Sequence, residues 1–227
     1  MIHLFALLSL LLCGVCYTGF QNSSHFHNTS NRRSLLLLVF GGALLLRLLL
    51  AYTTHGFSND IACFAAWADR IFTLGPGQFY SAEMFTDYPP GFMYVLYLIG
   101  ALRSLLQIPY YSDLHILLLK LPAILCDIAC GFLLYREAVK RLHFSDLQGI
   151  FAASAYLFQP AVILNSSCWG QVDSVYTLMI ILMCLFLMKG NLLPAYAVYG
   201  LGVLLKPQML IFTPVLLAGI WDHVFLQ

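Results

Sequence analysis

The sequence predicts an all-α protein, a polytopic bundle of membrane-spanning helices. Of its 227 residues, 61% are hydrophobic and only 9% are charged, and the mean hydropathy is +0.84. Soluble globular domains carry about 25% charged residues. Long apolar runs recur along the chain, and the few basic residues cluster between them, as in cytoplasmic loops. The net charge of +1 argues against a nucleic acid or another polyanion as a partner.

Six stretches after residue 33 are predicted to cross the membrane. A helical crossing needs about 20 mostly apolar residues. The last apolar stretch is too long for one crossing, and Lys206-Pro207 interrupts it. Proline ends one helix and readily begins the next, so we divide the stretch there. The predicted spans are Ser34–Tyr52, Asp113–Tyr135, Leu147–Asn165, Val172–Met188, Leu192–Leu205 and Pro207–Trp221.

The basic clusters orient these spans. Arg32-Arg33, the group from Arg136 to Arg141, and Lys189 all fall on one side when the spans alternate, and that side is predicted to be cytoplasmic. Residues 53–112 then form one long external loop. Pro90–Gln107 lies in this loop, and its uncharged run of about 15 residues is short for a crossing. We therefore expect a juxtamembrane helix there.

The first 33 residues are predicted to lie apart from the module formed by residues 34–227. Met1–Phe20 is apolar but lacks a basic start, so it is a poor secretory signal. Two alternatives stay open: an extra span with its N-terminus outside, or an unstructured leader. Cys13 and Cys16 form a CxxC without a second pair, and all seven cysteines are interpreted as small packing residues.

Polar residues gather at the predicted external ends of the spans. Ionisable groups inside a membrane cost at least a few kcal/mol and indicate a functional site by default. The orientation did not use these residues, so their convergence is independent support for an external site. They are Asp60, Asp87, Lys120, Gln171, Asp173, Lys206 and Gln208.

Other polar or aromatic residues leave alternatives open. Asp127 lies seven residues after Lys120 on one helical face, where these residues either serve the site or pair with polar partners and fix the packing. Arg47 either extends its charge outward or pairs with a carboxylate. Trp169 is either an anchor at the membrane interface or a platform for a substrate.

Asp60 begins a predicted amphipathic helix. Ser58 or Asn59 can cap this helix. Its apolar positions recur at helical spacing and would lie on the membrane surface; they are Ile61, Phe64, Ala65, Ala68, Ile71 and Phe72. A carboxylate in the first turn is stabilised by the helix N-terminus and stays ionised at neutral pH. Asp60 is therefore better suited to be a general base than a general acid.

Four stretches carry a resemblance to a known family. They are FSNDIACFAAWADRI (57–71), DYPPGFMYVLY (87–97), LLKLPAILCDIACGFLLYR (118–136) and NSSCWGQVDSVY (165–176), the last followed by LLKPQ (204–208). Together they resemble the GT-C superfamily of polytopic glycosyltransferases, and within it the prokaryotic branch related to the second mannosyltransferase of GPI-anchor assembly. The WGQVDS stretch with a later KPQ is the more specific part of this resemblance.

The resemblance implies an enzyme that moves a hexose, such as mannose, from a polyprenyl-phosphate donor to an acceptor hydroxyl with inversion. Asp60 would be the general base. Asp87, Tyr88 and Lys206 would lie near the lipid phosphate, with Lys120 or Arg103 as alternatives to Lys206. Trp169, Gln171, Asp173 and Gln208 complete the predicted substrate site.

The acceptor would be a lipid, a glycan or a protein. The resemblance also implies a bacterial plasma membrane with the site facing outward. Gln171 and Asp173 would bind sugar hydroxyls, or a divalent metal ion if the enzyme uses one; the metal requirement stays open.

Two other classes remain as alternatives. A transporter or channel also has charged residues in its helices and helices broken by proline. A non-catalytic subunit of a glycosyltransferase complex is the second alternative. Members of the GT-C superfamily usually have more membrane helices and a further C-terminal part, so this chain is expected to be the N-terminal module of a longer enzyme.

Overall fold

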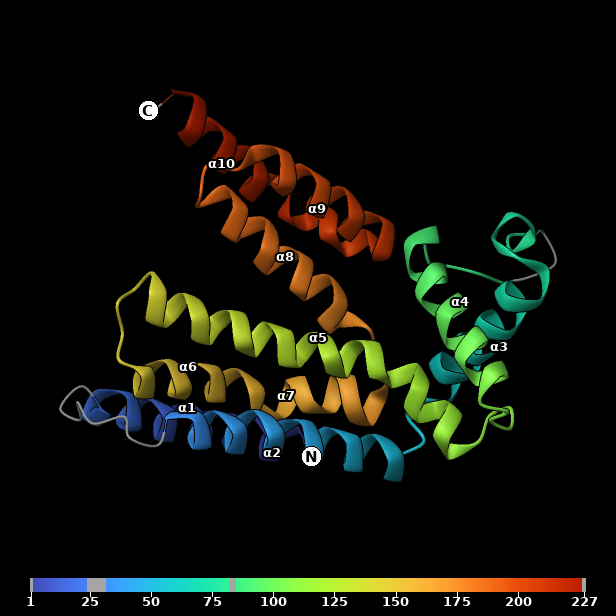
Figure 1. Cartoon of the computed structure of the whole chain (residues 1–227), viewed down its shortest axis with the longest axis horizontal. Helices are drawn as coiled ribbons and strands as arrows, with labels where there is room; N and C mark the ends of the chain where they lie inside the picture. The colour runs from blue at the N-terminus through green and yellow to red at the C-terminus, as the bar shows by residue number, and fades with distance from the viewer. Residues whose placement is uncertain (1, 24–31, 82–84, 226–227) are drawn as a thin grey trace. The chain divides into compact units, whose positions relative to one another are not determined.

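The computed structural model describes residues 2–23, 32–81 and 85–225 (Figure 1). These residues form helices and turns without any strand, which confirms the predicted all-α class. The elements are α1 Ile2–Ser23, α2 Arg32–Thr53, α3 Ser58–Leu74, η1 Pro76–Gln78, α4 Pro90–Leu105, α5 Asp113–Lys140, α6 Asp146–Leu157, α7 Pro160–Ile163, η2 Leu164–Trp169, α8 Asp173–Leu187, α9 Leu192–Leu205, η3 Pro207–Phe212 and α10 Thr213–Phe225.

Two helices of the described chain are long and apolar enough to cross a membrane. They are α2 and α5, at the predicted spans Ser34–Tyr52 and Asp113–Tyr135. The count rises to three if the bent pair Asp146–Leu157 and Pro160–Trp169 is one span. The other apolar helices are shorter than a crossing requires, so six full crossings are not found. The length and composition of α2 and α5 are consistent with membrane association.

The predicted span Leu147–Asn165 does not form a single straight helix. The segment bends by 52° between α6 and Pro160–Trp169. Pro160 has no N–H to donate to the carbonyl four residues earlier, and its ring clashes with that carbonyl, so the helix cannot continue straight through it. The chain closes α6 locally instead: the Phe158 N–H donates to Ser154 O, and the Gln159 N–H to Tyr156 O.

The predicted helix Pro207–Trp221 also needs correction. Lys206 is extended, as expected before proline. The chain then forms the 3₁₀ segment η3, in which the Met209 N–H donates to Lys206 O, before α10 begins at Thr213. The predicted break at Lys206-Pro207 and the preceding helix Leu192–Leu205 are confirmed. The helix predicted over Val172–Met188 is found as α8.

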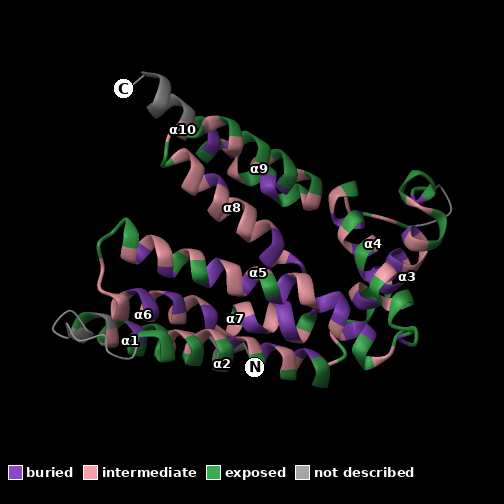
Figure 2. Ribbon diagram, in the orientation of Figure 1, coloured by how far each residue is buried: buried purple, intermediate pink, exposed green. Residues whose placement is uncertain are grey.

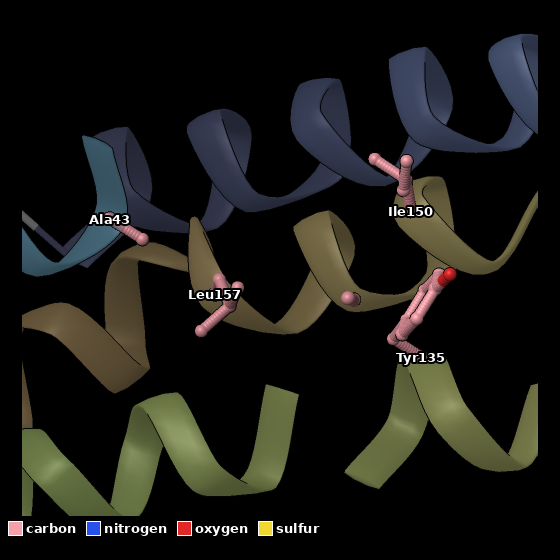
Figure 3. Close-up of a cluster of buried hydrophobic side chains, with 5 residues drawn as sticks. Ala43, Tyr135, Ile150 and Leu157 are labelled. Carbon is pink, nitrogen blue, oxygen red and sulfur yellow. The ribbon is translucent and has the colours of Figure 1, made fainter. Parts of the chain in front are cut away.

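The chain divides into two compact units. Unit 1 comprises Met1–Phe57 and Ala123–Ser174, and its core joins α2, α5 and α6. Figure 3 shows Tyr135 of α5 near Ile150 of α6, with Leu157 and Ala43 further along the same interface. The leader is helical as α1, whose Gly19 closely approaches Phe151 of α6. Residues 24–31 of the predicted linker lie outside the described residues.

Unit 2 comprises Ser58–Pro122 and Val175–Gln227. One of its cores joins α8, α9, η3 and α10 through Met183, Ala195, Met209 and Leu216. The other part pairs α3 with α4, where a Cβ on Gly100 would meet Ala68 O at 2.4 Å. Only glycine permits backbones this close.

The predicted apolar face of α3 is largely confirmed. Ile61, Phe64, Ala65, Ala68 and Ile71 are all buried, and Phe72 is partly buried. Figure 2 shows buried residues along α3 interspersed mainly with residues of intermediate burial. Trp67, which the periodicity did not include, is buried as well. The buried face fixes the rotation of α3 and therefore the direction in which Asp60 points.

Candidate functional site

The predicted site residues fall in both units. Unit 1 holds three of them, Trp169, Gln171 and Asp173. Unit 2 holds the other six, which are Asp60, Asp87, Tyr88, Lys120, Lys206 and Gln208. Each group is described within its own unit.

Two carboxylates of unit 2 lie around Cys63. Asp60 and Cys63 are one turn apart on α3, and Asp87 lies in the segment that precedes α4. Burial raises the pKa of the Cys63 thiol, and the negative charges of Asp87 and Asp60 raise it further. Asp60 is partly buried and Asp87 is exposed. The charges of both predicted acidic residues therefore affect the same thiol. Solvent reaches both carboxylates.

Tyr88, which follows Asp87 in the sequence, lies in an aromatic cluster. Its ring centroid is 5.5 Å from that of Phe64, 5.7 Å from Trp67 and 5.5 Å from Phe92. The Tyr80 hydroxyl donates to the Tyr88 carbonyl at 3.0 Å. Rings of α3 and α4 thus pack against the Tyr88 ring, and Tyr80, in the segment between these helices, fixes the Tyr88 backbone.

Lys206 is held by two tyrosine rings. Its Nζ lies 5.8 Å from the Tyr88 centroid and 5.7 Å from that of Tyr176. An ammonium group over an aromatic face is attracted by the negative face of the ring. The two contacts position one cation next to the segment that carries Asp87. Unit 2 therefore brings Lys206 onto the ring of Tyr88, whereas Asp60 and Asp87 are linked through their common effect on the pKa of Cys63.

The remaining two predicted residues of unit 2 differ in accessibility. Lys120 is completely buried on α5, whereas Gln208 is exposed in η3. A buried lysine is available only to a group that enters the protein, so Lys206 is the better candidate for an external phosphate.

In unit 1, the WGQVDS stretch forms a turn built around Asn165. Residues Leu164–Trp169 form a π-helical turn, which ends at Gly170 with φ of +89°. The Asn165 carbonyl accepts from the N–H groups of Gly170 and Gln171, at 3.1 and 3.0 Å. Its side-chain Nδ2 donates to Asp173 Oδ2 at 2.9 Å. The turn therefore fixes Asp173 at the start of α8.

Trp169 is half exposed and packs on Phe57, with ring centroids 5.3 Å apart. The Phe57 N–H also donates to the Trp169 carbonyl at 2.9 Å. The exposed ring suits both alternatives, an anchor at the interface and a platform for a substrate.

A buried ion pair lies elsewhere in unit 1. Arg47 Nε donates to Asp127 Oδ2 at 3.2 Å, and neither side chain has exposed surface. The Tyr156 hydroxyl donates to the other carboxylate oxygen at 3.2 Å. An Arg47 terminal nitrogen donates to the Leu157 carbonyl at 2.7 Å. For Arg47 and Asp127, the alternative of pairing is therefore confirmed, and the pair supports the end of α6.

No group of three or more His, Cys, Asp or Glu side chains in the described residues is arranged to hold a metal ion. The structure therefore adds nothing in favour of the divalent-ion alternative for Gln171 and Asp173.

Sequence reasoning missed three residues of these sites: Cys63, Asn165 and Tyr176. Cys63 was treated as packing, although its spacing of three from Asp60 places both on one face of α3. Asn165 ends a long apolar run, and a polar amide there is a usable signal for a turn. Tyr176 gave no signal, because its partner Lys206 lies 30 residues away in the sequence.

Comparisons with protein-family models, with curated protein sequences and with solved structures give no match to this chain. The resemblance to the GT-C superfamily accordingly depends on the four sequence stretches alone.

Proposed function

We propose that the chain is a membrane glycosyltransferase of the GT-C type that transfers a hexose, such as mannose, from a polyprenyl-phosphate donor to an acceptor hydroxyl. The observation that carries the proposal is the composition of the cluster in unit 2. It combines two carboxylates near Cys63 with a lysine held between Tyr88 and Tyr176. A base and a cation are the two groups that this displacement needs.

Asp60 is assigned the role of the base. It accepts the proton of the acceptor hydroxyl as that oxygen attacks the anomeric carbon. The bond between the anomeric carbon and the phosphate oxygen breaks at the same time, and the configuration inverts. No covalent intermediate with the protein forms in this scheme.

Lys206 is assigned to the leaving phosphate. Negative charge grows on the phosphate oxygen as the bond breaks, and a fixed cation stabilises that charge. The rings of Tyr88 and Tyr176 hold the ammonium group before the donor binds, so less reorganisation is needed during the reaction. Asp87 is assigned to binding the donor together with the aromatic cluster.

The proposal includes a polytopic bundle with its site at the outer face of a bacterial plasma membrane. The two long apolar helices α2 and α5 support membrane insertion. The basic clusters at Arg32-Arg33 and Arg136–Arg141 support the orientation. The lipid tail of the donor would lie in the bilayer, which puts its phosphate at the interface.

Replacing Asp60 with Asn tests the assignment of the base. In membranes that contain the chain within its functional enzyme, hexose transfer from a radiolabelled polyprenyl-phosphate hexose should fall by about 10²- to 10⁴-fold, the usual effect of a general base. The loss should appear in kcat with little change in KM, since Asn retains the size and polarity of the side chain.

Asp113→Asn is the matched control, because Asp113 is an exposed carboxylate of the same unit outside the cluster. It should leave the transfer rate unchanged. Expression and detergent-solubilised size should be the same for both variants. Residual activity of Asp60→Asn within tenfold of the unchanged enzyme would exclude Asp60 as the base.

A transporter remains the second candidate, because the buried pair of Arg47 and Asp127 lies at a broken helix. A transporter would need this pair to meet water from both sides of the membrane in turn. Cysteines introduced at Asp127 and Lys206 would then react with membrane-impermeant maleimide from either side in different states. Reaction at Lys206 from the outside alone, with none at Asp127, favours the enzyme.

A further inference from the structure

Two basic segments that lie far apart in the sequence meet at one end of unit 1. Arg32, at the start of α2, donates from Nε to the Tyr135 hydroxyl of α5 at 3.0 Å, across 103 residues. The same nitrogen lies 3.1 Å from Asp146 Oδ1, at the start of α6. The Tyr135 hydroxyl donates to that carboxylate at 2.8 Å. The start of α2 is therefore fixed beside the turn that joins α5 to α6, and Figure 1 shows both at the same end of unit 1.

The surface around this contact concentrates positive charge. Residues 32–33 and 136–146 include five basic side chains and two acidic ones, which gives a net charge of +3 with His143 neutral. The whole chain carries only +1. Solvent reaches all five basic side chains. These residues, named the basic patch below, are Arg32, Arg33, Arg136, Lys140 and Arg141.

Arg33 occupies a helix position that disfavours a cation. Helix α2 begins with Arg32 and Arg33 and has no acidic residue in its first turn. The backbone N–H groups at a helix N-terminus carry partial positive charge, so an anion is stabilising there and a cation is not. Asp146 compensates the charge of Arg32. An anion from outside the chain would compensate that of Arg33, whereas Lys140, the last residue of α5, is already favoured by the helix C-terminus.

Large apolar side chains are exposed next to the basic patch. Leu37 and Leu38 follow Arg33 by about one turn of α2 and are 75% and 70% exposed. Phe132, one turn before Arg136 on α5, is 52% exposed. Helix α2 fully buries only three of its 22 residues. Basic residues beside an exposed apolar surface are typical of a membrane interface, where the charges lie among the lipid headgroups.

The charged and the apolar surface together select one kind of partner. A soluble polyanion would neutralise the basic patch but leave the exposed leucines in water. A zwitterionic lipid would cover the leucines but bring its own cation towards the arginines. An anionic phospholipid supplies a phosphate and acyl chains in one molecule. The patch also lies at the end of unit 1 that is predicted to be cytoplasmic, and the cytoplasmic leaflet is the one that carries anionic lipids.

We propose that the basic patch binds the headgroups of anionic phospholipids, whose acyl chains lie along the exposed leucines of α2. Arg33, Lys140 and Arg141 donate to the phosphate, and each arginine can donate two parallel hydrogen bonds to its oxygens. Arg32 stays with Asp146 and Tyr135 and holds the start of α2 beside α5. None of the residues assigned to hexose transfer takes part, so the inference does not depend on the proposed function.

Native mass spectrometry of the full chain in a neutral detergent tests the proposal. The chain is titrated with dioleoylphosphatidylglycerol and with dioleoylphosphatidylcholine, which differ in headgroup charge and share their acyl chains. We expect the dissociation constant for phosphatidylglycerol to be lower by at least about fivefold, the factor that one basic residue contributes near an anionic lipid surface. The triple variant Arg33→Gln, Lys140→Gln and Arg141→Gln should bind both lipids equally, because the charges that distinguish them are gone.

The matched control keeps the charges and changes the side chains. The variant Arg33→Lys, Lys140→Arg and Arg141→Lys should retain the preference for phosphatidylglycerol. All three positions are exposed, and thermal unfolding without added lipid shows whether each variant is folded. If the triple glutamine variant is unfolded, Arg33→Gln alone decides the question. It should reduce the preference without lowering the unfolding temperature, because it removes a cation from a helix N-terminus.

Four results would overturn the proposal. The first is equal binding of the two lipids by the unchanged chain. The second is a glutamine variant that keeps the full preference for phosphatidylglycerol. The third is a charge-preserving variant that loses as much of the preference as the triple glutamine variant does. The fourth is displacement of phosphatidylglycerol by an equal concentration of sn-glycerol 3-phosphate, which would make the basic patch a site for a soluble anion.

Discussion

Two of the Arg–Asp pairs in the described part of the chain, Arg47–Asp127 and Arg103–Asp69, have the same composition and opposite surroundings. In unit 1, Arg47 and Asp127 have no exposed surface and share further bonds with Tyr156 and the Leu157 carbonyl. In unit 2, the side chains of Arg103 and Asp69 are 18% and 41% exposed. One pair is closed off on every side, and the other lies beside the Tyr110 ring and is reached by solvent.

The difference separates a charge pair that only the protein surrounds from one that solvent reaches. Breaking a buried pair leaves an uncompensated charge in a medium that solvates it poorly, so each partner depends on the other. A pair that water reaches contributes little to stability and can exchange partners. In the sequence, both arginines simply interrupt an apolar helix, and nothing in the local pattern distinguishes them.

The largest effect is expected from Arg47→Met. This change leaves Asp127 buried without its cation and removes a donor from the Leu157 carbonyl, so the free energy of unfolding should fall by about 3–5 kcal/mol. Reversible unfolding by SDS in mixed micelles measures it. Arg33→Met, at an exposed position of the same helix, is the control. An equal loss in both variants would contradict the structural role of the pair.

The double variant Arg47→Met with Asp127→Leu sharpens the result. It removes both charges, so no uncompensated charge remains, and it should recover most of the stability lost in Arg47→Met. The Leu157 carbonyl still lacks its donor, which leaves a deficit of about 1–3 kcal/mol. The same SDS titration gives the coupling energy of the cycle. Additive losses would show that the two residues act independently.

Asp69→Asn should have a smaller effect on stability. The pair is partly exposed, solvent screens the charges, and the Asn oxygen still accepts from Arg103, so the loss should stay below about 1 kcal/mol. If Asp69→Asn lowers the free energy of unfolding as much as Arg47→Met does, the two pairs do not differ in their contribution to stability. The double variant Asp69→Asn with Arg103→Gln provides the corresponding coupling energy.

The smallest expected effect is on the reactivity of Cys63. Burial raises the pKa of this thiol first, and the charges of Asp87 and Asp60 raise it further. A raised pKa means less reactive thiolate at pH 8. Asp87→Asn removes one of the causes, so the pKa should fall and alkylation by iodoacetamide should become faster. Mass spectrometry of the peptide that contains Cys63, over a range of pH, measures the shift.

The control for this measurement is Asp113→Asn, which should leave the alkylation rate of Cys63 unchanged. If Asp87→Asn slows alkylation or does not affect it, then Asp87 is not close to Cys63. The proposed cluster of two carboxylates would in that case lose the electrostatic evidence that supports it.

Helices and their buried faces were largely predictable from the sequence. The face of α3 followed from the spacing of Ile61, Phe64, Ala65, Ala68 and Ile71, because a helix that buries one side must repeat apolar residues at its own period. The end of α9 followed from Pro207. The bend at Pro160 had the same signal, but the apolar run on both sides concealed it.

The pairing of polar groups was not predictable in the same way. Arg47 meets Asp127 across 80 residues and Leu157 across 110 residues. Such contacts depend on how the helices pack, which no local pattern specifies. The cluster of Asp60, Asp87, Tyr88 and Lys206 could be anticipated as a group, whereas the role of Tyr176 beside Lys206 could not.

The contact between Arg47 and the end of α6 also has a consequence for biosynthesis. Ribosomes make α2 before α5 and α6, so the guanidinium of Arg47 exists before either Asp127 or the Leu157 carbonyl has been synthesised. A lone charge in the middle of an apolar segment is costly in lipid. Helix α2 should therefore stay at the protein-lined insertion machinery until α5 and α6 arrive, and the three segments should leave for the bilayer together.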